Sequence, residues 1–181
     1  MDGLADFIFE HAPIGLVATR HRLIEACSPR FAEMFGYAPA ELEGKSLALL
    51  YPTTQEFIDI GHLGWGQLKE TQRYNDNRIM KRRDGSQFWC QVHGKSATPH
   101  DPFAHCVWSF VDLSHQRPIV NLTRREREIA MLIVEGLTNK QIGQRLGVSH
   151  RTIEAHRSRM MNKVGARTSA ELFFMVAGLP A

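Results

Sequence analysis

The sequence contains no long apolar run. Its longest apolar stretches, such as AMLIV at 130–134, are far too short to span a bilayer. The first residues, MDGLADFIFEHAP, start acidic and hold no long apolar stretch, so we expect no signal peptide. The three cysteines, Cys27, Cys90 and Cys106, show no CxxC spacing, and we interpret them as reduced thiols. These absences argue against a membrane-spanning helix and a disulfide framework, and they favour a cytoplasmic protein.

The sequence also lacks the short motifs of catalytic and metal sites. None of the nine histidines has the ligand spacing HExxH, and His100 and His105 have no acid or thiolate cluster beyond Cys106. No phosphate-cradling glycine-rich loop, nucleophile motif or pair of carboxylates is present. We therefore expect neither an enzyme nor a metal-binding protein.

Positive charge is concentrated in the last third of the sequence. The 181 residues are 43% hydrophobic and 23% charged, which is typical of a globular protein with one ordinary domain or two small ones. Residues 1–117 hold 12 Lys and Arg against 14 Asp and Glu, whereas residues 118–181 hold 10 against 5. A basic segment beside a mildly acidic one suggests a nucleic-acid reader attached to another domain. On charge alone, a solvated basic face explains the segment equally well.

Helix start and stop signals punctuate the basic segment. Capping boxes, with Glu or Gln three residues after a threonine, begin at Thr123, Thr138 and Thr168, and Ser149 is a further N-cap residue. Glycines stand where helices should end, at Gly136, Gly147 and Gly165. We predict four helices, near residues 124–135, 139–146, 150–164 and 169–178.

The second and third of these helices, joined by LGVS, predict a helix-turn-helix. At about 100° per residue, Ile153, Met160 and Val164 of the third helix return to one side and form an apolar stripe. The opposite side carries mostly small or polar residues, namely Arg151, Ala155, Ser158 and Asn162, flanked by Glu154, Arg159 and Lys163. Such a face fits the major groove of DNA, with the basic side chains on phosphates.

The segment LTRREREIAMLIVEGLTNKQIGQRLGVSHRTIEAHRSRMMNKVGARTSAEL resembles the DNA-binding domain of the LuxR/FixJ family over most of 122–172. The motifs LTxREREI, GLTNKQI, LGVSxRTIExH and KVGAR occur in order at the family's spacing. The resemblance implies dimerisation through the last helix and binding to near-palindromic double-stranded DNA. It implies base-reading residues at Glu154, Ala155 and Ser158, and phosphate contacts at Asn139, Lys140, Ser149, Arg151, Thr152, His156, Arg157 and Lys163.

Some of these roles have alternatives. Glu154 either accepts from a cytosine N4 or orients a neighbouring arginine, Arg151 or Arg157. His156, about 60° from the apolar stripe, either packs half-buried or contacts a phosphate. Arg157 lies nearer the core edge, so we expect it to reach sideways to the DNA backbone. The last helix is more apolar than its own domain needs, and we expect part of its apolar surface to form a dimer contact, from Leu172, Phe173, Val176 and Leu179.

The first 114 residues alternate short strands and helices. We predict strands at 14–19 and 23–26, a helix opened by Ser28-Pro29, short helices near 39–42 and 46–50, a helix over 53–69, and strands near 73–82, 87–97 and 104–113. With IGLVATRHRLIEACSPRFAEMFGYAPAELEGKSL, RRDGSQFW and FVDLS, this order resembles a PAS domain. The preceding LADFIFEHA resembles the amphipathic helix that packs at PAS dimer interfaces. We therefore predict an α+β protein: a PAS domain with a five-stranded antiparallel sheet and small helices, then a four-helix helix-turn-helix domain.

PAS domains cup small ligands between the sheet and the small helices, and strand alternation indicates the lining. The expected lining is Phe88, Cys90 and Val92 and, by comparison with flavin-binding relatives, Cys106, Trp108 and Phe110. Gly94 is expected to leave room for Trp108. Either an unidentified small molecule occupies the cup or these side chains fill it. Haem and flavin are disfavoured, because His62 is the only candidate axial ligand near the long helix and no cysteine lies in the photoreceptor motif.

These observations predict a one-component transcription regulator that binds double-stranded DNA as a homodimer and responds to a signal at its PAS domain. The alternative is a DNA-binding effector whose PAS domain is a protein-docking or dimerisation module without a ligand. The expected parts are an N-terminal helix (1–11), the PAS domain (12–114), a linker with Pro118 (115–121) and the DNA-binding domain (122–181).

Overall fold

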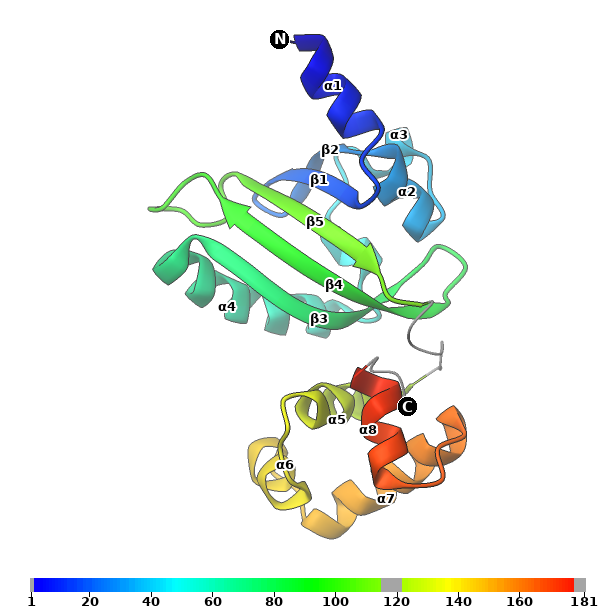
Figure 1. Ribbon diagram of the computed structural model, residues 1–181. Coiled ribbons are helices and arrows are strands. Elements are labelled where there is room, and N and C mark those ends of the chain that lie inside the picture. The colour runs from blue at the N-terminus through cyan, green and yellow to red at the C-terminus, as the bar shows by residue number, and fades with distance from the viewer. Residues whose placement is uncertain (1, 115–121, 178–181) are drawn as a thin grey trace. The chain divides into compact units, whose positions relative to one another are not determined.

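The computed structural model describes residues 2–114 and 122–177, so the expected linker at 115–121 lies outside the described residues. The described chain divides into two compact units, one built on a sheet and one made of helices (Figure 1). A short helix, α1 (Asp2–Glu10), precedes the sheet. Its apolar side chains Leu4, Phe7 and Ile8 are more than half exposed. The predicted α+β fold is confirmed.

The first unit is a five-stranded antiparallel sheet with strand order β2-β1-β5-β4-β3 and helices packed against it. Its elements are β1 (Gly15–Arg20), β2 (Leu23–Cys27), α2 (Pro29–Phe35), α3 (Pro39–Leu42), the 3₁₀ helix η1 (Leu47–Leu50), α4 (Thr54–Thr71), β3 (Arg73–Lys81), β4 (Gln87–Ser96) and β5 (Cys106–Asp112). Helix α4 runs beside β3 (Figure 1). The predicted order of two strands, small helices and three strands is confirmed.

Aromatic side chains of α2 and β5 form the centre of this unit. Ser28 accepts a hydrogen bond from the backbone N–H of Phe31, which starts α2 where Pro29 already favours a helical turn. Phe31 and Phe35 then pack on Phe110, with ring centroids 5.0 and 6.1 Å apart. All three rings are almost fully buried, and this contact holds α2 on the sheet.

The register between β4 and β5 places the Trp108 ring over a glycine. Gly94 of β4 is paired with Trp108 of β5, and a methyl group at Gly94 would overlap the indole ring. The indole N–H donates a hydrogen bond of 2.8 Å to the hydroxyl of Thr19, which is itself buried. The prediction that Gly94 leaves room for Trp108 is confirmed.

The second unit consists of four helices that begin and end close to the predicted residues. They are α5 (Arg124–Val134), α6 (Asn139–Leu146), α7 (His150–Val164) and α8 (Ser169–Ala177). The capping boxes at Thr123 and Thr138 are present with both hydrogen bonds. The third box differs: Glu171 donates its N–H to Thr168, but its carboxylate reaches one residue further back, to the N–H of Arg167.

The core of the helical unit is formed by one face of each helix. Its most completely buried side chains are Ile129 and Ala130 of α5, Ile142 of α6, Ile153 and Met160 of α7, and Leu172 of α8. Val164, expected in the same stripe as Ile153, is the last residue of α7 and stays half-buried. Gly136, Gly147 and Gly165 have φ values of 82°, 66° and 75°, so they end or follow helices in the left-handed conformation that glycine tolerates.

Candidate nucleic-acid interface and ligand cavity

Helices α6 and α7 are joined by a tight turn as predicted. Gly147 ends α6, and Ser149 begins α7 by accepting a hydrogen bond of 3.1 Å from the N–H of Thr152. Gly143 is buried under this turn, and a methyl group there would lie 2.7 Å from the carbonyl oxygen of Val148. The turn is therefore closed against α6, which fixes the direction in which α7 leaves it.

Helix α7 separates its buried and exposed faces as its periodicity predicts. Ile153 and Met160 have no exposed surface, whereas the predicted base-reading residues Glu154, Ala155 and Ser158 are exposed. Predicted phosphate-contacting residues lie around them or at the helix starts, with Arg151, Thr152, Ser149 and Lys140 exposed and Asn139 half-buried. Lys140 and Ser149 line one open hollow between the ends of α6 and α7. The outward surface of α7 is thus free to meet a partner, and the DNA contacts themselves stay predictions.

His156 and Arg157 are less exposed than the other predicted contacts. The Nδ1 atom of His156 is buried and has no hydrogen-bond partner among the described residues. Burial and the nearby charges of Arg159 and Arg125 lower the pKa of His156, so the neutral imidazole is favoured. This arrangement favours the packing role of His156. Burial also lowers the pKa of half-buried Arg157.

Lys163 has a partner inside its own unit. Its Nζ atom lies 2.6 Å from Oε2 of Glu126, whose side chain is 2% exposed. The same carboxylate oxygen accepts the backbone N–H of Thr123 at 2.7 Å. Lys163 therefore joins α7 to the start of α5, a role that the sequence did not indicate.

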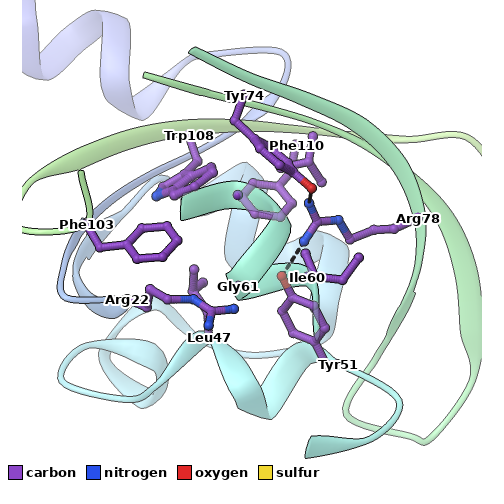
Figure 2. A pocket seen from close by; sticks show the side chains of 12 residues that line it. Arg22, Leu47, Tyr51, Ile60, Gly61, Tyr74, Arg78, Phe103, Trp108 and Phe110 are labelled. Atoms are coloured by element: carbon purple, nitrogen blue, oxygen red, sulfur yellow. Dashed lines mark hydrogen bonds between the residues drawn. The ribbon is translucent and has the colours of Figure 1, made fainter. Parts of the chain in front are cut away.

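The sheet unit encloses a small cavity between the sheet, α4 and η1 (Figure 2). The space open to the centre of a water molecule is about 20 Å³. It is lined by Arg22, Leu47, Tyr51, Ile60, Gly61, Gly64, Tyr74, Arg78, Val92, Phe103, Trp108 and Phe110. Two arginines and two tyrosines thus stand among apolar and aromatic side chains.

Arg78 of β3 is almost fully buried and extensively hydrogen-bonded. Its guanidinium donates to the hydroxyls of Tyr51 and Tyr74 and to Oδ1 of Asp76, the last at 2.7 and 2.8 Å. Burial acts to lower the pKa of Arg78, but Tyr51 and Asp76 outweigh it and hold the pKa above its ordinary value. Burial raises the pKa of Tyr74 far above its ordinary value, so its hydroxyl stays protonated. The Arg78–Asp76 pair is 2.7 Å apart and balances the charge on this side of the cavity.

Arg22 reaches the cavity from the turn between β1 and β2. Its Nη2 donates to the backbone carbonyl of Phe57 at 2.8 Å, and its guanidinium carbon lies 3.4 Å from the centroid of the Phe57 ring. Phe103 provides a second ring at 5.4 Å. Burial lowers the pKa of Arg22, and no carboxylate among the described residues forms an ion pair with it.

Comparison with known families identifies both units. The family model of the PAS domain matches residues 11–115, and that of bacterial regulatory proteins of the luxR family matches residues 120–176. The chain belongs to the PAS–LuxR regulators.

Relatives of this PAS–LuxR regulator are known from sequence and structure. The sensor protein TdiS of Thauera aromatica is 33% identical over 129 residues, which are 71% of this chain and 24% of TdiS. The chain spans about a quarter of the length of the curated relatives it matches. The PAS domain of a LuxR-family transcriptional regulator from Burkholderia thailandensis, solved in complex with ethanol, is 43% identical, with a TM-score of 0.59 over 60% of this chain and 96% of that chain.

VqmA of Vibrio cholerae resembles the regulator over both units. Its TM-score is 0.58 over 99% of this chain and 91% of that chain, at 15% identity, and at this identity the likeness shows the fold alone. In the described parts of the regulator, none of the helices has the length and apolar character needed to cross a membrane. Among the same residues, no three His, Cys, Asp or Glu side chains gather into a group that could hold a metal ion.

The sequence located only part of the regulator's cavity. Val92, Trp108 and Phe110 line it, whereas Phe88, Cys90 and Cys106 are buried but do not line it. Strand alternation identifies which face of a strand is covered, but it does not say how far the cavity extends along that strand. His62, the candidate axial ligand, is exposed on α4 and does not line the cavity.

The polar lining was missed by sequence reasoning. Tyr51 comes from the residue after η1, Arg22 from a hairpin turn, and Tyr74 and Arg78 from β3. One signal was available: Tyr74, Asp76 and Arg78 share a side of β3 with Met80, which is fully buried. Charged residues at inward positions of a strand indicate a buried ion pair.

Proposed function

We propose that the protein is a dimeric transcription regulator that reads DNA with α7 and responds to a small molecule held by its PAS domain. The observation that carries the proposal is the division of α7, in which Ile153 and Met160 are fully buried while Glu154, Ala155 and Ser158 are exposed together. Short side chains on the outward face let the helix approach base edges closely, and exposed Arg151 beside them suits a phosphate. No catalytic step is part of this function.

Dimerisation is supported by apolar surface that the units leave uncovered. Leu4, Phe7 and Ile8 of α1 are 64%, 59% and 56% exposed. On α8, Leu172 and Val176 are buried in their own unit, so of the expected dimer residues the half-buried Phe173 is the one available, and Leu179 lies outside the described residues. VqmA, which shares the fold, is known as a dimer with a target DNA.

A small-molecule signal is supported by the cavity and by one relative. The cavity is lined by groups that donate hydrogen bonds, and the related PAS domain from Burkholderia thailandensis was solved with ethanol. The second candidate function is a PAS domain that only dimerises or docks a protein. It is favoured by the small size of the cavity, about 20 Å³, and by the exposed apolar side chains of α1.

The proposal is tested by selecting binding sites from random DNA with the full chain and measuring stoichiometry on the selected site. We expect two half-sites about 10 base pairs apart, centre to centre, each with one protein chain. Affinity should fall steeply with salt, since phosphate contacts release counterions. A single half-site bound by one chain would contradict the dimer, and equal affinity for all DNA would contradict sequence reading. Native mass spectrometry of freshly purified protein separates the two candidate functions, because a retained small molecule adds mass.

A further inference from the structure

The cavity of the sheet unit carries more positive charge than its own residues neutralise. Two arginines line it, and no Asp or Glu does. Arg78 has Asp76 at 2.7 Å, but Arg22 has no such partner among the described residues. A partly buried guanidinium without an anion is costly, because the surrounding protein solvates charge less well than water.

The backbone brings Arg22 to this place at a cost. His21 and Arg22 are the two central residues of the β1–β2 hairpin, and both have positive φ, 47° and 66°. Such turns normally contain Asn or Gly, because side chains disfavour this conformation. Strained residues of this kind cluster at functional sites, where the surrounding structure imposes them.

Helix α4 also provides space for the Arg22 side chain. Gly61 lines the cavity, and a methyl group there would overlap Nη1 of Arg22. Figure 2 shows the guanidinium of Arg22 extending toward the cavity beside Gly61, with Arg78 entering from the opposite side. Gly66, on the same helix, has no atom within 4 Å of such a methyl group.

Hydrogen-bond donors of Arg22 and Tyr51 converge on the cavity. The hydroxyl oxygen of Tyr51 accepts from Arg78 and interacts with Arg22, and arginine only donates, so the hydroxyl hydrogen remains available. Among the described residues this hydrogen has no acceptor. Tyr74, in contrast, donates to Oδ2 of Asp76 at 2.7 Å. Arg22 and Tyr51 therefore present donors to the same space.

We propose that this cavity binds a small carboxylate, which Arg22 and Tyr51 hold by its oxygens while its carbon atoms contact the apolar lining. The inference rests on the proposed function that the PAS domain binds a small molecule, and it gives that molecule a chemical class. Planar guanidinium groups match carboxylates with paired hydrogen bonds. A free space of about 20 Å³ is of the order of one or two water molecules, so the ligand has few non-hydrogen atoms.

The test compares acetate with acetamide, its neutral isostere, on the full-length protein. The three tryptophans give three indole N–H signals in an NMR spectrum, and the signal of Trp108, which lines the cavity, reports binding. Sodium chloride at equal concentration controls for ionic strength. We expect acetate to shift the Trp108 signal with saturation and acetamide to shift it much more weakly.

Two variants and a matched control locate the site. Arg22→Gln removes the charge, and Gly61→Ala displaces the guanidinium while favouring the helix. Both should weaken acetate binding about 10- to 100-fold, the loss expected for a charged hydrogen bond. Gly66→Ala, on the same helix, should bind as the unmodified protein does.

The outcomes separate this inference from the proposed function. If acetamide and acetate bind equally well and Arg22→Gln changes neither affinity, the proposal of a carboxylate ligand is wrong. A neutral small molecule would then remain as the candidate signal. No saturable shift with either compound would overturn the inference as well, and it would make Arg22 a side chain that fills the cavity. Neither result affects the selection of binding sites from random DNA, because that experiment tests sequence reading and dimerisation independently of the cavity.

Discussion

Nζ of Lys163 lies 2.6 Å from Oε2 of Glu126, so the last turn of α7 is tied to the first turn of α5. The Glu126 side chain is 2% exposed and that of Lys163 is 36% exposed, which places this ion pair at the edge of the core. Glu126 also closes the capping box of α5 with Thr123. A lysine that family resemblance assigns to a DNA phosphate therefore also forms an ion pair inside the helical unit.

Lys163→Ala should lower the free energy of unfolding of the helical unit by about 1–2 kcal/mol. The variant leaves the Glu126 carboxylate buried without its ammonium, and the partial exposure of Lys163 limits the loss. Lys140→Ala removes the same charge from an exposed side chain and should leave stability unchanged. Urea denaturation followed by circular dichroism measures both. Equal stability of the two variants would show that the ion pair contributes nothing.

Acid should destabilise the helical unit through Glu126. Burial acts to raise the pKa of Glu126, but hydrogen bonds from Lys163 and Thr123 outweigh it and hold the pKa below the ordinary 4.5. A carboxyl group with a lower pKa in the folded state stabilises the fold above its unfolded pKa, and this stability is lost as pH falls through the folded pKa. Stability measured by denaturation across pH should therefore fall below about pH 4.5. The stability of the Glu126→Gln variant should fall less steeply with decreasing pH. An equally steep fall would show that other carboxyl groups cause the acid destabilisation.

Arg151 and Glu154 should differ in how they affect DNA binding. Arg151→Ala should weaken binding to all sequences and reduce the slope of log affinity against log salt by about 1, because one phosphate contact is lost. Glu154→Ala should instead change preference at one base position, by about 1–3 kcal/mol. Fluorescence anisotropy on the selected site and on single-base variants of it measures both effects. A uniform loss on every sequence for Glu154→Ala would contradict its base-reading role.

Gly94→Ala should destabilise the sheet unit by about 1–3 kcal/mol, because the added methyl group overlaps the Trp108 ring and displaces it. Tryptophan fluorescence during denaturation reports the loss. Gly66→Ala adds the same methyl group where nothing lies within 4 Å, and on a helix it should raise stability by about 0.5–1 kcal/mol. A Gly94→Ala protein as stable as the unmodified chain would show that Trp108 moves freely.

The ends of helices could be predicted because their signals are local. Thr138 and Ser149 accept hydrogen bonds from backbone groups three residues away. Gly147 ends α6 with a φ of 66°, a conformation that glycine tolerates without support from other parts of the fold. The exposed face of α7 followed from periodicity for the same reason. The five-stranded antiparallel sheet was predicted only through family resemblance, and which strands are neighbours was not predicted, since pairing joins residues far apart in the chain, such as Val17 and Trp108.

The lining of the cavity could be predicted only in part from the sequence. Strand alternation placed Val92 in the lining, where it lies, yet it placed Phe88 there as well. Trp108 was expected there by comparison with flavin-binding relatives, and it lines the cavity. Which inward side chains meet empty space depends on how α4 and η1 cover the sheet, and a strand pattern contains no information on that cover. Arg22 was missed because it lies between the two predicted strands at 14–19 and 23–26, and strand alternation does not say where the side chain of a turn residue points.

The sequence by itself determined the helices, the strands and the outward face of α7, because hydrogen bonds and periodicity within one element decide these. The change of charge along the chain indicated the two units. Tertiary structure alone decided that Lys163 meets Glu126, 37 residues away, and that Arg22 and Arg78 share a cavity. These pairings depend on packing between elements, where a displacement of a few ångströms makes or breaks a hydrogen bond. The charged side chains can therefore be read from the sequence, whereas the side chains that they contact can be read only from the fold.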